Sequence, residues 1–253
     1  MKDVILSAKG LCKSFAHNGG QVHILSQVDL ELYKGDFTVI MGASGSGKST
    51  LLYAMSGMDR ATAGEVVYQG ENLVTMGEKK LAGLRHGAFG FVFQQMHLVS
   101  NLTLFENVAV PGYLNKTVPA EQVRERADSL LKSMGLEKVS SHLPSQVSGG
   151  EQQRCAIARA VINQPELLFA DEPTGALNRR NTTEVLNLLT RLNQAGQSIL
   201  MVTHDLRAAL RATRILYLED GQIIGELALP EYDRQEEKSR EIQVNAWLDS
   251  LAW

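Results

Sequence analysis

Apolar residues along the chain fall into short runs that alternate with longer helical patterns. Residues 37–41 form a continuous apolar stretch, which is typical of a central parallel strand covered on both faces. Residues 22–32 alternate apolar with polar side chains and predict one or two half-buried strands, and a looser alternation over residues 4–11 predicts another. A glycine-rich turn then leads into a helical pattern from residue 48 to about residue 58.

The same alternation continues through the rest of the chain. Strands are predicted over residues 88–93, 167–170, 198–203 and 214–218, and helices over residues 120–134, 151–163, 182–195 and 206–212. Strands that alternate with helices imply an α/β fold with a mostly parallel sheet, here preceded by an antiparallel β part. The region from about residue 95 to residue 160 is mainly helical, which indicates an inserted helical subdomain.

Composition narrows the classes of protein that fit this pattern. Hydrophobic residues make up 44 % of the 253 residues, charged residues make up 21 %, and the net charge is -3. These values are ordinary for a globular protein, and there is no basic excess of the kind that favours nucleic acid as a partner. Two cysteines, Cys12 and Cys155, are too few for a disulfide framework. The first ten residues have no apolar core long enough for a signal peptide, and no run of about 18 apolar residues occurs, so we expect any membrane role to come through a partner.

The turn between the strand at 37–41 and the following helix reads Gly-Ala-Ser-Gly-Ser-Gly-Lys-Ser. This spacing fits the P-loop, in which glycines let the backbone wrap around phosphates and a helix N-terminus attracts the anion. A chance glycine-rich turn is the alternative, but the flanking strand and helix argue against it. The residues expected to bind the nucleotide are Gly42, Ala43, Ser44, Gly45, Ser46, Gly47, Lys48, Ser49 and Thr50.

A second motif is an apolar strand that ends in two acids, Asp171 and Glu172. Asp171 is expected to hold Mg²⁺, commonly through water, together with the hydroxyl of Ser49. Glu172 is expected to orient and deprotonate the attacking water. Acidic residues often end strands, so this pattern gains its meaning from the P-loop that precedes it.

Residues 147–151 read Val-Ser-Gly-Gly-Glu and resemble the ABC signature, with Val in place of Leu and Glu in place of Gln. A serine hydroxyl, glycine N–H groups and a helix start can cap a γ-phosphate. The resemblance implies that Ser148, Gly149, Gly150 and Glu151 serve ATP held by a second copy in a head-to-tail dimer. The simpler interpretation is a helix N-cap with Glu151 as the capping-box acid, and both interpretations can hold together.

The remaining marks of ABC ATPases follow in order. Gln94 stands at the Q-loop position, where it would contact Mg²⁺ or water and report the nucleotide state. His204 matches the switch histidine that contacts the γ-phosphate, and Phe15 stands where the family has an aromatic residue stacked on adenine. The alternatives are a solvated glutamine, a structural histidine and a core aromatic side chain.

The resemblance covers about residues 4–225. Within the class, the chain is similar to the branch that serves macrolide export, lipoprotein release and antimicrobial-peptide resistance. It implies a P-loop NTPase (RecA-like) core at about 1–94 and 164–229, a helical subdomain at about 95–163, and a tail at 231–253. It also implies ATP and Mg²⁺ as cofactors. The implied catalytic residues are Lys48, Gln94, Glu172 and His204. The implied metal ligands are Ser49, Gln94 and Asp171. An integral membrane permease is the implied partner, which places the chain at the cytoplasmic face of the membrane.

Three features stand outside the shared motifs. Most relatives carry Asp where this chain has Asn178, in the loop that crosses the dimer, and the peptide-resistance transporters often tolerate Asn there. The apolar stretch at 96–99, with Leu102, Leu104 and Phe105, is either a docking surface for the membrane partner or core packing. In the tail, residues 232–240 are expected to be solvated or disordered. Val244, Trp247, Leu248 and Leu251 recur at helical spacing and fit either folding back or a partner contact.

Two other functional classes remain open from the sequence. A soluble ABC-type ATPase in DNA maintenance would usually separate the P-loop from the signature by long coiled coils, whereas about 100 residues intervene here. A translation-factor relative would normally carry two cassettes in one chain. We therefore expect a transport motor, with the export or detoxification of a hydrophobic or peptide-like substrate as its role.

Overall fold

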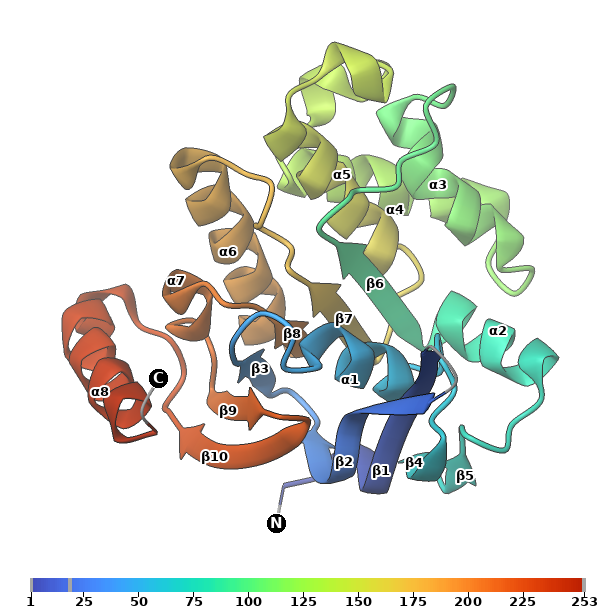
Figure 1. Cartoon of the computed structure of the whole chain (residues 1–253). Coiled ribbons are helices and arrows are strands. Elements are labelled where there is room, and N and C mark those ends of the chain that lie inside the picture. Colours follow the sequence, from blue (N-terminus) through green and yellow to red (C-terminus); the bar gives the residue numbers. More distant parts are fainter. Residues whose placement is uncertain (1, 18–19, 252–253) are drawn as a thin grey trace. The chain divides into compact units, whose positions relative to one another are not determined.

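The computed structural model describes residues 2–17 and 20–251 and divides the chain into two compact units (Figure 1). Unit 1 comprises Met1–Leu81 and Leu192–Trp253, and unit 2 comprises Ala82–Arg191. These limits differ from the predicted limits of the helical subdomain, because the strands on either side of the helical region belong with it in unit 2. The predicted α/β fold, with antiparallel strands first and helices inserted later, is confirmed.

The N-terminal part of unit 1 is an antiparallel sheet in the order β2-β1-β4-β5. Along β2, the residues Val28, Leu30 and Leu32 are buried while their neighbours are exposed, as the alternating pattern predicts. The region predicted as one or two strands is therefore a single strand that pairs with β1 along its length. The bounds are β1 (Val4–His17), β2 (Gly20–Tyr33), β4 (Ala63–Tyr68) and β5 (Glu71–Asn72).

The second sheet region of unit 1 is parallel around β3. This strand lies between β8 and β9, is parallel to both, and is buried at every position, as its continuous apolar run predicts. Strand β9 turns back into β10 at Asp220 and Gly221, whose φ angles of 46° and 74° fit a tight two-residue hairpin. The bounds are β3 (Phe37–Met41), α1 (Lys48–Met55), β8 (Ser198–Val202), α7 (Leu206–Ala209), β9 (Arg214–Glu219) and β10 (Gln222–Ala228).

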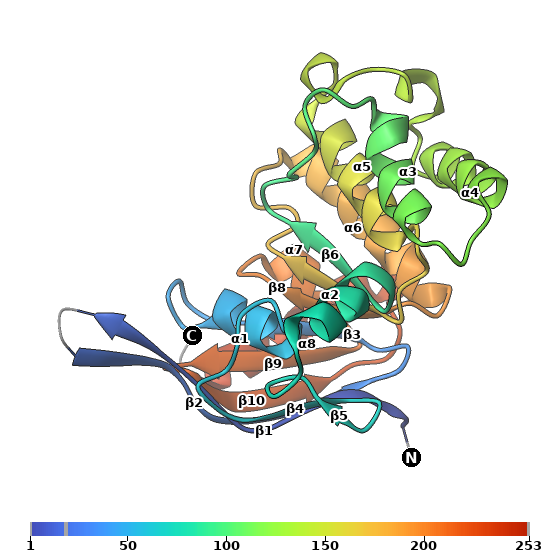
Figure 2. The ribbon, with the colours of Figure 1, turned by 90° about the vertical axis from the view of Figure 1, so that its right-hand side faces the viewer.

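Unit 2 contains a parallel strand pair and the helices that gather around α5 (Figure 2). Phe91 stacks on Phe169 across this pair with ring centroids 5.4 Å apart, so aromatic contacts hold the two strands together. Helices α2 and α6 cross the limits between the units. The bounds are β6 (Phe89–Phe93), β7 (Leu167–Asp171), α2 (Glu78–Gly87), α3 (Leu104–Leu114), α4 (Ala120–Ser133), η1 (Glu137–Val139), η2 (Pro144–Gln146), α5 (Gly149–Val161) and α6 (Arg179–Gln194).

The tail forms a short 3₁₀ turn, η3 (Arg234–Glu236), followed by helix α8 (Glu237–Ser250). Val244 and Leu248 are fully buried, and Trp247 approaches Gly225 of β10, so the apolar stripe folds back onto unit 1. The absence of a side chain at Gly225 makes room for this close approach.

The expectation that residues 232–240 are solvated is wrong at two positions. Tyr232 and Arg240 are buried, and Arg240 donates hydrogen bonds to the carbonyl oxygens of Pro230 and Ala212. Burial first, and a hydrogen bond to Glu237 second, raise the pKa of Tyr232 to about 12. In the described part of the chain, no helix combines the length and apolar character needed to span a membrane.

Candidate functional site

The glycine-rich loop between β3 and α1 has the backbone that the P-loop motif requires. Gly42, Gly45 and Gly47 have φ angles of 152°, 85° and 101°, which side chains with a Cβ atom rarely adopt. A Cβ atom at Gly42 would lie 2.1 Å from the carbonyl oxygen of Leu218, so no larger residue fits there. The loop therefore wraps closely enough to bring backbone N–H groups around a small anion.

The start of helix α1 is open to an anion. Gly47 at the N-cap provides no side-chain hydrogen bond, and the first turn contains no acidic residue. The Nζ atom of Lys48 lies 2.8 Å from the carbonyl oxygens of both Gly42 and Ala43, which aims its charge at the loop. The buried hydroxyl of Ser46 has no hydrogen-bond partner. An uncapped helix N-terminus, a lysine and an orphaned hydroxyl together fit a phosphate group.

His204 lies at the same edge of the sheet as the P-loop. Strands β3 and β8 are parallel neighbours with Ile40 opposite Val202, so both carboxyl ends meet at one edge. Thr203 donates its backbone N–H to Ile40 and is fully buried, whereas His204 is exposed. The fold thus anchors the residue before the histidine and leaves the imidazole at the ligand-binding edge of the sheet.

Phe15 is an exposed aromatic residue near the end of β1, with 43 % of its surface accessible. The alternative interpretation as a core aromatic side chain is therefore wrong. Phe15 pairs with Val22 across the ribbon, and the Nζ atom of Lys13 lies 4.7 Å from the ring centroid. An accessible ring in unit 1, the same unit as the P-loop, is the arrangement needed to stack on a base.

In unit 2, the residues predicted for hydrolysis follow two paired strand ends. Phe93 at the end of β6 lies opposite Asp171 at the end of β7, so Gln94 and Glu172 both begin the loops at this edge. Glu172 has a φ angle of 45°, an unfavourable left-handed backbone of the kind that is often found at functional sites. The amide of Gln94 would contact a Cβ atom at Gly175 at 2.9 Å, so the small glycine accommodates the glutamine.

The signature motif begins helix α5, and the N-cap interpretation is confirmed. The hydroxyl of Ser148 accepts from the backbone N–H of Glu151 and donates to its carboxylate at 2.7 Å. The backbone N–H of Ser148 donates to the same carboxylate at 2.8 Å. These hydrogen bonds lower the pKa of Glu151, which keeps the carboxylate ionised at the helix start.

The sequence interpretation missed two side chains of α5 that hold the loop after Gln94. Gln153 donates to the carbonyl oxygen of Phe93 at 3.1 Å. Arg159 donates to the carbonyl oxygens of Met96 at 2.7 Å and His97 at 2.6 Å. In the sequence, the contact between α5 and this loop is signalled only by two polar residues, Gln153 and Arg159, on the helix that starts with the signature. The signature helix and the Gln94 loop are therefore joined by three side-chain-to-backbone hydrogen bonds.

Asn178 acts as a cap for helix α6. Its side-chain oxygen accepts from the backbone N–H of Asn181 at 3.0 Å. Asparagine and aspartate cap helices about equally well, so the departure at this position preserves the local structure. The side chain of Asn181 in turn lies over Gly150, where a Cβ atom would approach it to 2.4 Å. The signature glycine and the start of α6 are thus in direct contact within unit 2.

The apolar stretch considered as a docking surface is divided by the fold. Leu104 is completely buried, so it belongs to the core of unit 2 and cannot contact a partner. Val99 is 49 % exposed, and on α3 the side chains of Tyr113 and Leu114 are 44 % and 66 % exposed. Exposed apolar side chains therefore occur in unit 2 at Val99 and at the end of α3, and Leu104 is not among them.

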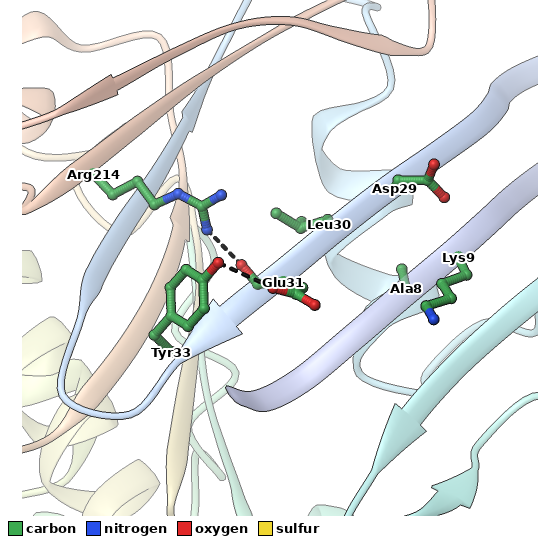
Figure 3. Close-up of a pocket in the computed structure, with 7 residues that line it drawn as sticks. All are labelled: Ala8, Lys9, Asp29, Leu30, Glu31, Tyr33 and Arg214. Atoms are coloured by element: carbon green, nitrogen blue, oxygen red, sulfur yellow. Dashed lines mark hydrogen bonds between the residues drawn. The ribbon is translucent and has the colours of Figure 1, made fainter. Parts of the chain in front are cut away.

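A hollow of about 370 Å³ in unit 1 is a second place where polar groups converge (Figure 3). There Arg214 donates to the backbone carbonyl of Glu31, and the Tyr33 hydroxyl donates to the Glu31 carboxylate at 3.0 Å. Arg214 also pairs with Glu226 at 2.7 Å. These groups satisfy one another, so we interpret the hollow as part of the packing between β2 and β9.

The donors predicted for the metal have the chemistry that Mg²⁺ prefers. Ser49, Gln94 and Asp171 present hydroxyl, amide and carboxylate oxygens, which are hard ligands. Among the residues described, no group of three or more His, Cys, Asp or Glu side chains could hold a metal ion. Mg²⁺ in nucleotide sites is usually bound by one or two protein oxygens together with the phosphates. Each donor, taken in its own unit, therefore has the chemistry of a ligand to Mg²⁺ that arrives with a nucleotide.

Comparison with known proteins decides the family. The sequence model of the family described as ABC transporter matches residues 25–175, which include the P-loop, Gln94, the signature and both acids. This chain belongs to the ABC transporter family. It is an ATP-hydrolysing cassette of that family, and the recognition made from the signature motif is confirmed.

The cassette is similar to macrolide export ATP-binding/permease proteins called MacB. It is 41 % identical over 226 residues to the protein of Pasteurella multocida, covering 89 % of this chain and 35 % of that protein. Against the protein of Vibrio parahaemolyticus the identity is 42 % over 226 residues, with 89 % and 34 % covered. The cassette thus spans about a third of the length of these curated relatives.

Solved structures of cassettes share the fold. The dimeric, post-hydrolysis structure of the ATP-binding cassette MJ0796 bound to ADP and Pi has a TM-score of 0.82 and 37 % identity. The match covers 90 % of this chain and all of that chain. The cassette cbiO1 from Clostridium perfringens has a TM-score of 0.80 and 26 % identity, with 99 % and 98 % covered.

Proposed function

We propose that the cassette is the motor of a membrane export complex and binds ATP through the P-loop and Phe15. The single observation that carries this proposal is the open start of α1, where the glycine loop, Lys48 and the orphaned Ser46 hydroxyl converge. The similarity to MacB proteins favours transport over DNA maintenance or translation. A hydrophobic or peptide-like substrate, with antimicrobial-peptide resistance as one case, is the finer proposal.

Each site residue has a role in this proposal. Lys48 and the loop N–H groups hold the β- and γ-phosphates, and Phe15 stacks on adenine. Glu172 accepts the proton of the attacking water, and His204 holds the γ-phosphate in place. Ser49, Asp171 and Gln94 would hold Mg²⁺, which would supply positive charge to the phosphate oxygens.

A second copy completes the proposed mechanism. Ser148, Gly149 and Gly150 of one copy would cap the γ-phosphate held by the other, since the relative MJ0796 is dimeric. A membrane permease is the proposed partner, with docking through the exposed apolar surface around Val99 and Leu114. This arrangement would place the cassette at the cytoplasmic face of the membrane.

The test uses the full chain, purified alone and with its membrane partner. Equilibrium binding of Mg·ATP should be lost in Lys48→Ala and kept in Lys80→Ala, whose lysine is exposed and pairs with Glu71. Val99→Asp should reduce transport by the complex while the ATPase activity of the isolated cassette is unchanged. Equal ATP binding by Lys48→Ala and the unmodified chain would contradict the proposal.

A further inference from the structure

Lys13 is a buried lysine on the strand that carries Phe15. Only 8 % of the residue is exposed, and its Nζ atom contacts three partners. It lies 2.6 Å from a carboxylate oxygen of Asp59, 2.7 Å from the carbonyl oxygen of Arg60, and 4.7 Å from the ring centroid of Phe15. A buried ammonium is unfavourable unless it is paired, so this geometry is specified by its three partners.

Asp59 and Arg60 lie in the loop after the helix that begins at the P-loop, which ends at Met55. The backbone N–H of Asp59 donates to the carbonyl oxygen of Tyr53 inside α1, so the loop is anchored on that helix. The ion pair from Lys13 therefore ties the β1–β2 ribbon to the loop at the far end of α1.

The start of α1 contacts the same ribbon through the cross-strand neighbour of Lys13. Leu25 lies opposite Lys13, and its Cδ2 atom is 3.2 Å from the position of a Cβ atom at Gly47. Residues directly opposite in an antiparallel pair share one face of the sheet. Lys13 and Leu25 thus fix the ribbon against both ends of α1, and the ring of Phe15, two residues beyond Lys13, lies against the Lys13 ammonium.

We propose that Lys13 is a positioning residue for the nucleobase, which sets the place of the Phe15 ring relative to the P-loop. The ammonium covers part of the ring by a cation–π contact and leaves an exposed surface for an adenine. The inference rests on the proposed stacking of Phe15 on adenine. It predicts that Lys13 contributes to binding of the base and contributes nothing to binding of the phosphates.

The experiment compares ATP with inorganic tripolyphosphate, which has the phosphates and lacks the base. In Lys13→Met, the Kd and KM for ATP should rise by about 5- to 30-fold, in line with stacking and cation–π contributions. The Kd for tripolyphosphate and the kcat should stay unchanged. Lys13→Arg should restore ATP binding, because guanidinium keeps the charge and the pairing with Asp59. Lys9→Met, at an exposed position of the same strand, is the matched control.

The outcomes separate the two proposals. Phe15→Ala with unchanged ATP affinity would overturn the stacking itself. If Phe15→Ala weakens ATP binding and Lys13→Met does not, or if Lys13→Met weakens both ligands equally, only the role of Lys13 is overturned. Should Lys13→Met fail to fold, Asp59→Asn replaces it, because that change removes the ion pair with Lys13 while the lysine side chain itself is kept. The same selective loss of ATP affinity is then expected, and its absence rejects the inference.

Discussion

Helices α1 and α5 both begin at glycine-rich turns, and both are proposed to bind phosphate, yet their first turns differ. At α1 the N-cap is Gly47, which offers no side-chain hydrogen bond, and the first turn contains no acid. At α5 the cap is Ser148, and Glu151 completes a capping box with an ionised carboxylate. The four N–H groups at a helix start need partners, and the two helices meet this need in opposite ways.

This difference indicates which site acts first. The first turn of α1 has no side-chain cap and no acidic residue, so a phosphate can approach its N–H groups without repulsion. At the start of α5 the capping box already engages the N–H groups of Ser148 and Glu151, and the Glu151 carboxylate repels an approaching anion. We infer that α1 binds nucleotide in a single subunit, whereas α5 contributes only when a second copy brings a phosphate to it and Ser148 exchanges its partner.

The largest expected effect separates nucleotide binding from hydrolysis. Glu172→Gln removes the proposed general base and should reduce ATP turnover by about 10²- to 10⁴-fold. Binding at α1 should remain, so the trapped nucleotide gives α5 time to engage. Light scattering with Mg·ATP should show dimers of Glu172→Gln, and monomers once nucleotide is removed. A variant that hydrolyses ATP at the normal rate would remove Glu172 from the mechanism.

The next prediction concerns the left-handed glycine at the N-cap of α1. Gly47→Ala forces a side chain into a left-handed backbone, which costs roughly 1–2 kcal/mol, and brings Cβ to 3.0 Å from the carbonyl oxygen of Ile24. Thermal unfolding should show this loss together with weakened ATP binding. Gly77→Ala is the control, because nothing lies within 4 Å of a Cβ atom there and its φ angle is not positive. Equal stability of the two variants would argue against the strained loop.

A smaller effect tests the cap of α5. Ser148→Ala should reduce stability by about 1 kcal/mol in chemical unfolding, the usual contribution of a serine cap. Thr103→Ala is a matched control, since Thr103 and Glu106 form the same capping box on α3. Both changes should reduce stability, but only Ser148→Ala should weaken ATP-driven pairing in the Glu172→Gln background. If both variants pair normally, Ser148 serves the helix alone.

The smallest effect concerns pH. The pKa of Glu151 is lowered in the folded chain by its hydrogen bonds to Ser148, so the carboxylate stabilises the fold above its unfolded pKa. This contribution is lost as pH falls below the ordinary pKa of a glutamate and through the lowered pKa of Glu151. Urea unfolding from pH 7 to pH 3 should therefore show a smaller decline in Glu151→Gln than in the unmodified chain. Identical pH profiles would mean that the capping carboxylate has no net effect.

The central elements could be predicted from the sequence because one physical signal dominates each of them. The strand Phe37–Met41 is a continuous apolar run, and the P-loop glycines and lysine have no simpler explanation. The signature, the strand-ending acids and the tail stripe were found in the same way. The boundaries of α1 and α5 came within three residues of the observed ones.

Other elements were missed because their local patterns are weak. Strands β4 and β5 are short and half exposed, and α3 contains Pro111, which argues against a helix in any sequence pattern. Arg240 and Lys13 were assigned to no site, because burial of a charged side chain depends on partners that lie far away in the sequence. The contacts of Gln153 and Arg159 with the Gln94 loop are of the same kind.

The left-handed backbone at Glu172 has a consequence for how this protein tolerates change. Glycine adopts such a φ angle of 45° without strain, so Glu172→Gly should raise the melting temperature even though it removes the proposed base. Screens that select only for heat resistance would therefore favour a durable but inactive protein. Selection for turnover, in contrast, would keep glutamate at position 172, and the rest of the fold must then offset the cost of its left-handed backbone.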